Sequence, residues 1–126
     1  MTHYSRIARI VIDSPAATHD AEVSFWREAT GVALKRYERF PDYHGGRLAD
    51  GMGLLTQQLG DGEARIHLDV HTTDRGAEVA RLTALGASVV REAEHWTVMS
   101  DPAGLLFCVV PDPPGMLTDD NAQRWD

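Results

Sequence analysis

The sequence predicts an α+β fold of two βαβββ modules in tandem, whose strands form a curved mixed sheet around a cup-shaped pocket, with the helices on the outer side. Two observations support this prediction. A strand-like run, a turn, a helix-like stretch and a glycine occur in that order over residues 7–31 and again over residues 64–86. Each is followed by three shorter strand-like runs, which gives a repeat of about 50 residues, the size of one supersecondary unit.

In the first module, β-branched residues over 7–12 predict a buried strand. Asp13-Ser14-Pro15 ends it, and a helix follows that begins after either Ser14 or Thr18 and ends before Gly31. Weaker patterns predict further strands at residues 33–39, 47–49 and 53–59, with a turn at Gly45-Gly46.

In the second module, residues 64–71 alternate between apolar and polar side chains, as in a strand with two unlike faces. Thr73 or Asp74 caps a helix that extends to Leu85 before Gly86. Strands are predicted at residues 88–92, 97–100 and 105–110, and the turn from Asp101 to Gly104 joins the last two as a hairpin.

A chain of 126 residues with 43% hydrophobic residues corresponds to one domain, here residues 1–126. Module one spans about residues 5–60 and module two about residues 63–111. The segment 112–126 is rich in proline and aspartate and is predicted to be an irregular tail that Trp125 anchors to the domain.

The net charge of −7 argues against nucleic-acid binding and against an anionic membrane surface, because both require basic residues. No apolar run is long enough to span a membrane, and the first residues do not resemble a secretory signal. A single cysteine, Cys108, cannot form an internal disulfide. We therefore expect a cytoplasmic protein.

Three motifs resemble those of a known family. They are the strand 65–70 leading into Thr73-Asp74, the helix end and strand 85–90, and the hairpin 96–104 before the last strand. In these motifs the chain resembles the small glyoxalase-like proteins of the vicinal oxygen chelate superfamily, which includes bleomycin resistance proteins and dioxygenases. The resemblance implies the cup-shaped fold described above and a small-molecule ligand. Many such relatives also form homodimers.

In metal-binding members, four strand positions hold a divalent ion, and these correspond here to Arg9, Gln57 (or Gln58 in the other register), His67 and Cys108. Arginine has no lone pair to give a metal, and a thiolate suits zinc better than harder ions. The resemblance therefore implies a degenerate metal site, in which any divalent metal cofactor has fewer ligands than usual.

The pocket is expected to be lined by six residues: Arg9, Gln57, His67, Trp96, Phe107 and Cys108. His67 is the candidate catalytic residue, because an imidazole transfers protons near neutral pH. Arg9 either points into the cup and binds an anionic ligand through its guanidinium fork, or it points outward or pairs with an acid such as Asp69. His71 shares the face of His67 but lies about 13 Å further along the strand, too far to share one ion.

Three functions agree with these features. The first is a glyoxalase-like protein that binds a small anionic or carbonyl-bearing molecule. An enzyme of this kind would be a metal-dependent lyase, isomerase or dioxygenase acting on adjacent oxygens. The second is a metal-free protein that sequesters a drug or metabolite, and the third is an interaction module that functions as a homodimer.

Overall fold

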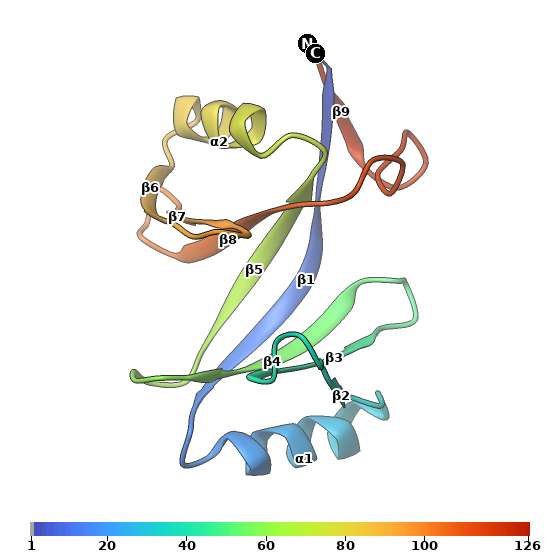
Figure 1. The fold of residues 1–126 in the computed structure, drawn as a ribbon, viewed down its shortest axis with the longest axis vertical. Helices are drawn as coiled ribbons and strands as arrows, with labels where there is room; N and C mark the ends of the chain where they lie inside the picture. Colours follow the sequence, from blue (N-terminus) through green and yellow to red (C-terminus); the bar gives the residue numbers. More distant parts are fainter. Residues whose placement is uncertain (1) are drawn as a thin grey trace. The chain divides into compact units, whose positions relative to one another are not determined.

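The computed structural model describes residues 2–126, so Met1 of the predicted domain lies outside the described residues (Figure 1). The two helices are α1 (His19–Thr30) and α2 (Arg75–Ala84). The strands are β1 (His3–Pro15), β2 (Lys35–Arg36), β3 (Tyr43–Arg47), β4 (Gly53–Leu59), β5 (Arg65–Thr72), β6 (Ser88–Glu92), β7 (Thr97–Ser100), β8 (Leu106–Pro111) and β9 (Gln123–Trp125). The predicted α+β class and the repeated order of strand, helix and three strands are confirmed.

The chain divides into two compact units, one made of residues 9–67 and the other of residues up to Ala8 together with 68–126. The strands β1 and β5 contribute residues to both units. The module boundaries near residues 60 and 63, and the pocket predicted inside the modules, stay predictions.

In the unit of residues 9–67, the strands follow the order β2-β3-β4-β1, with β1 parallel to β4 and β3 antiparallel to it. Parallel strands need a crossover between them, and α1 lies in this crossover. Ile12 of β1, Leu54 of β4 and Val23 of α1 form a buried cluster with Leu34. The sheet face that holds Ile12 therefore packs against α1.

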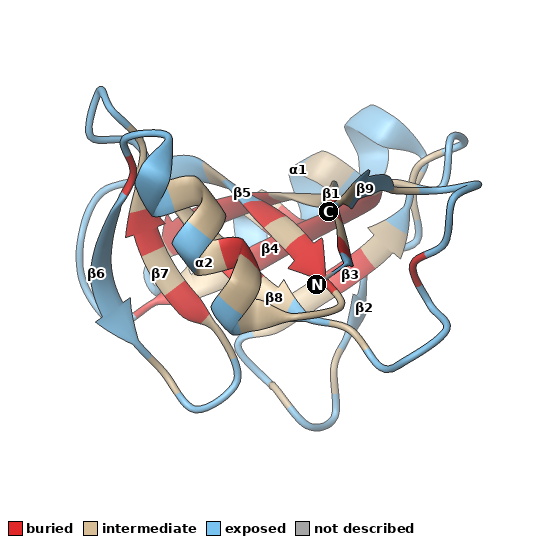
Figure 2. Ribbon diagram, turned by 90° about the horizontal axis from the view of Figure 1, so that it is seen from above, coloured by how far each residue is buried: buried red, intermediate tan, exposed pale blue. Residues whose placement is uncertain are grey.

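The other unit repeats this arrangement with strand order β5-β8-β7-β6, in which β5 and β8 are parallel. Met99 of β7 and Val109 of β8 are buried with Ala87, and Val79 and Leu82 of α2 pack against them. β6 pairs only with β7 in this order and is exposed along its whole length (Figure 2).

The helix ends follow from local sequence. The Asp74 carboxylate accepts a hydrogen bond from the amide of Ala77 at 3.0 Å, so Asp74 rather than Thr73 caps α2. α1 ends at Gly31, whose φ of 73° is accessible to glycine with little strain. In the hairpin between β7 and β8, Asp101 accepts the amides of Ala103 and Leu105 at 3.0 and 2.8 Å.

The strand predicted at residues 47–49 is wrong, because β3 covers Tyr43–Arg47 and includes the two glycines assigned to a turn. Both glycines are required by close packing. A Cβ atom on Gly45 would collide with the ring of Tyr37, and one on Gly46 would collide with the side chain of Val32. Here glycine permits a close approach of other side chains to the strand.

The irregular tail predicted for residues 112–126 is wrong at its end, where β9 pairs antiparallel with β1. The indole of Trp125 donates a hydrogen bond to Ser5 Oγ at 2.9 Å, and the Arg81 guanidinium lies 3.7 Å above its ring centre. Trp125 therefore anchors the C-terminal segment to β1 and α2.

A chain of polar side chains lies beside α1. Ser14 Oγ is 3.1 Å from Nδ1 of His19, whose Nε2 is 3.4 Å from Nδ1 of His44. Burial, together with the positive charges of His19, Arg27 and Arg36, lowers the pKa of His44. Neutral His44 is therefore the form that the folded state favours.

This shift predicts a loss of stability in mild acid. The pKa of His44 is lower in the folded chain than in the unfolded chain. The stability that neutral His44 contributes is therefore fully present above the unfolded pKa of about 6.5, and it is lost as the pH falls towards the folded pKa. Urea unfolding of the wild type and His44→Gln between pH 8 and 5 measures this. We expect a shallower pH dependence for the variant, and equal slopes would contradict the prediction.

Among residues 2–126, neither helix is long and apolar enough to cross a lipid bilayer.

Candidate functional site

The two faces of β5 differ in burial. Ile66 and Leu68 are 62% and 38% exposed, whereas Asp69 and His71 on the other face are each 6% exposed. Leu68 pairs with Phe107, which packs in the core beneath α2, so the polar face points away from that helix. Burying polar side chains costs free energy unless they have hydrogen-bond partners. A strand face that buries polar side chains is therefore a candidate for a functional site.

Asp13 on β1 orients His67 on β5. Nδ1 of His67 lies 2.6 Å from Oδ2 of Asp13, and Nε of Arg65 is 3.4 Å from the same oxygen. The Asp13 side chain is 1% exposed and that of His67 is 12% exposed. Because a carboxylate only accepts hydrogen bonds, Nδ1 of His67 carries a proton and chemistry at this ring falls to Nε2.

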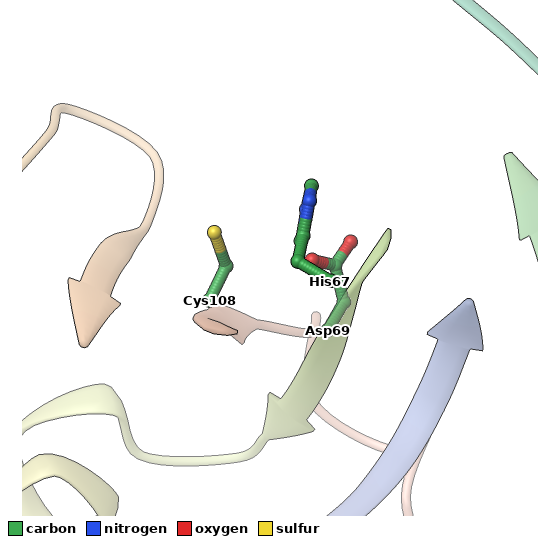
Figure 3. Close-up of side chains that lie close together, drawn as sticks. All are labelled: His67, Asp69 and Cys108. Atoms are coloured by element: carbon green, nitrogen blue, oxygen red, sulfur yellow. The ribbon is translucent and has the colours of Figure 1, made fainter. Parts of the chain in front are cut away.

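His67 lies close to two further groups that can bind a metal (Figure 3). One ring nitrogen of His67, a carboxylate oxygen of Asp69 and the sulfur of Cys108 all lie within 4.8 Å of one another. Asp69 is two residues from His67 on β5, and Cys108 is opposite Asp69 on β8. One nitrogen, one oxygen and one sulfur donor form a set that fits zinc, which binds all three.

The strand register separates two of the predicted site residues. Arg9 on β1 is opposite Gly53 on β4, whereas Gln57 is opposite Asp13. Because Asp13 follows Arg9 by four positions, Arg9 and Gln57 are about 13 Å apart along the strands. Gln57 is thus a neighbour of the Asp13–His67 pair, and Arg9 lies earlier on β1.

The two predicted aromatic residues lie on β8 and just before β7. Phe107 packs against the buried cluster of Met99 and Val109, on the opposite face of β8 from Cys108. Trp96 is half-buried just before β7, with its ring centre 6.3 Å from that of His95.

A second imidazole on β5 has a similar carboxylate partner. Nδ1 of His71 lies 2.8 Å from Oδ1 of Asp112, and Nε2 is buried with no hydrogen-bond partner among the described residues. The pair therefore fixes the orientation of His71, as Asp13 fixes that of His67.

Sequence reasoning missed Asp13, Asp69 and Asp112 as members of these groups. Asp69 carried a signal, because it alternates with His67 and His71 on one strand face. Asp13 lies two positions before a proline and Asp112 directly follows one, so the sequence predicts only a strand end and a tail segment at these positions. Nothing local linked either of them to a histidine.

The glyoxalase-like domain family matches residues 9–110 of this chain. No match was found among curated proteins. Among solved structures, the Mn(II)-bound glyoxalase from Novosphingobium aromaticivorans is 17% identical, with a TM-score of 0.61. That alignment covers 89% of this chain but only 40% of the glyoxalase.

Two methylmalonyl-CoA epimerases are similar to this chain over most of their own length. A variant of the Streptomyces coelicolor enzyme, in complex with 2-nitronate-propionyl-CoA, is 20% identical over 86% of this chain and 98% of its own, with a TM-score of 0.57. The Mycobacterium tuberculosis enzyme is 15% identical over 86% and 88%, with a TM-score of 0.58. These structural likenesses establish the fold alone. The family match over residues 9–110 shows that the chain belongs to the glyoxalase-like domain family of the vicinal oxygen chelate superfamily.

Proposed function

We propose that this protein binds a small molecule carrying a carbonyl or an anionic group at the polar face of β5, where His67 contacts it. The hydrogen bond of 2.6 Å between Asp13 and His67 is the observation that carries this proposal. It fixes both the tautomer and the orientation of an imidazole. With the proton on Nδ1, the Nε2 atom can take a proton from the carbon next to a carbonyl and can then return it.

The burial of the pair supports a functional role. The Asp13 carboxylate is 1% exposed, and its Oδ1 has no hydrogen-bond partner among residues 2–126. Keeping a buried carboxylate oxygen without a partner costs on the order of 1–3 kcal/mol. A site that must orient His67 requires this carboxylate in spite of the cost, so the burial supports a role for Asp13 in holding the imidazole.

A thermal-shift screen tests this proposal. The panel comprises small carboxylates, 2-oxoacids, hydroxyketones and aromatic aldehydes, each added to chelator-treated protein. We expect at least one class to raise the Tm, since a ligand at 100 times its Kd stabilises by about 2.7 kcal/mol. His67→Gln should abolish the shift, and His95→Gln, in the turn before β7, is the matched control. An equal shift for wild type and His67→Gln would refute the proposal.

A metal-dependent lyase, isomerase or dioxygenase is the second candidate function, and the cluster of His67, Asp69 and Cys108 favours it. These three residues would hold the ion, which would act as a Lewis acid on a bound carbonyl. Ligands found in the screen can be incubated with the protein in D₂O and followed by NMR. For this function we expect exchange of the proton next to the carbonyl, and we expect His67→Gln to reduce it. The absence of exchange would favour the first function, a protein that only binds a small molecule. The homodimer and the cytoplasmic location remain predictions.

A further inference from the structure

We infer that the molecule bound beside His67 is a short oxo acid, whose carboxylate is held by Arg65 while its carbonyl end lies at His67. The inference rests on the first proposed function and specifies the anionic group that the site recognises. All the residues that carry it belong to the unit of residues 9–67.

Arg65 and His67 share one carboxylate. Nε of Arg65 lies 3.4 Å from Oδ2 of Asp13, and Nδ1 of His67 lies 2.6 Å from the same oxygen. These two nitrogens are therefore no more than about 6 Å apart, which is the sum of the two distances. Both side chains lie on the same face of β5, because they are two positions apart on the strand. One small ligand can therefore contact the guanidinium and the imidazole together.

The guanidinium of Arg65 keeps hydrogen-bond donors available for a ligand. Its side chain is 49% exposed, and it pairs with Asp13 through Nε. Among residues 2–126, the two terminal nitrogens of this guanidinium have no hydrogen-bond partner. Nη1 lies beside Gly62, 3.8 Å from where a Cβ atom would be, so no side chain at that position covers it. Two such nitrogens bind a carboxylate through two parallel hydrogen bonds.

His67 is not suited to bind the carboxylate itself. Because Asp13 accepts the Nδ1 proton, Nε2 presents a lone pair, which repels a carboxylate oxygen. The Asp13 side chain is 1% exposed, so its charge is poorly screened and also repels an anion. Arg65 offsets that charge and supplies the N–H donors. Recognition of an anion at this site therefore falls to Arg65, and Nε2 of His67 is left for the carbon next to the carbonyl.

The short distance between the two groups favours a compact ligand. Its carboxylate must reach the guanidinium while the carbon that carries the exchangeable proton reaches the imidazole. In a 2-oxo acid such as pyruvate or 2-oxobutyrate, a single carbonyl carbon separates the carboxylate from that carbon. Such an acid places its charge at Arg65 and its reactive carbon at His67 with no further group between them.

Paired ligands added to chelator-treated protein test the inference. Isothermal titration calorimetry compares pyruvate, 2-oxobutyrate and phenylpyruvate with their methyl esters, which keep the carbonyl and lose the charge. We expect at least one acid to bind the wild type about 10-fold or more tightly than its ester, as charge-assisted hydrogen bonds imply. Arg65→Gln should abolish this preference and still bind the ester, and Arg65→Lys should keep part of it.

Arg124→Gln is the matched control, because the Arg124 side chain is 52% exposed and its Nε also pairs with a carboxylate, that of Asp126, at 3.1 Å. This variant should keep the preference for the acid. His67→Gln should weaken the binding of acid and ester alike, since both contain the carbonyl. Circular dichroism shows whether each variant is folded.

Equal affinity of the wild type for acid and ester, or an unchanged preference in Arg65→Gln, would overturn the inference. Binding of the esters, hydroxyketones or aldehydes that still depends on His67 would then leave the first proposed function standing. If no compound of any of these classes binds, the inference and the first proposed function both fail.

Discussion

Replacing Glu78 by glutamine should lower the free energy of unfolding by about 3–5 kcal/mol, because it breaks a buried ion network and leaves its other members without their counter-charge. Glu78 lies in α2 and is 0% exposed. Its two oxygens each lie 2.8 Å from the Arg81 guanidinium, and one is also 2.8 Å from Nε2 of His3. Urea unfolding at pH 7 measures the effect, with the exposed Glu28→Gln in α1 as the control.

The same network predicts how stability changes in acid. Burial raises the pKa of Glu78, but the hydrogen bonds from Arg81, His3 and Ser5 outweigh it, and the pKa is lowered overall. The stability that ionised Glu78 contributes is therefore fully present above its unfolded pKa of about 4.5, and it is lost as the pH falls towards the folded pKa. Stabilities of wild type and Glu78→Gln should converge as the pH falls below about 4.5, and a constant difference would contradict this account.

The network also joins segments that are far apart in sequence. Arg81 pairs with Glu78 and lies over the ring of Trp125, and Trp125 donates to Ser5 on β1. Losing Glu78 should therefore loosen β9 as well as α2. Hydrogen exchange at the β9 amides should increase in Glu78→Gln by more than in Glu28→Gln.

Local patterns predicted much of the fold because its signals are short-range. The Asp74 cap, the Gly31 helix end and the Asp101–Gly104 hairpin each act over a few residues, and the structure has all three. The strand period of two residues also suffices to predict that His67 and Asp69 lie on the same face of β5.

The site itself depends on register, which local patterns do not contain. Asp13 and His67 are 54 residues apart in sequence, and only strand alignment brings them together. β1 and β4 are parallel and joined by a long crossover, so no turn fixes their alignment, and the sequence does not contain the offset of four positions between Arg9 and Gln57. For the same reason, the sequence predicts only the end of a strand at Asp13.

Replacing Met99 by alanine should cost about 2–5 kcal/mol of unfolding free energy. Met99 is 0% exposed and packs with Ala87 and Val109 beneath α2, so truncation leaves a cavity in a filled core. Met116→Ala is the matched control, because Met116 is 55% exposed and its loss should change stability by less than about 0.5 kcal/mol. Equal losses for the two variants would show that this cluster is not a core.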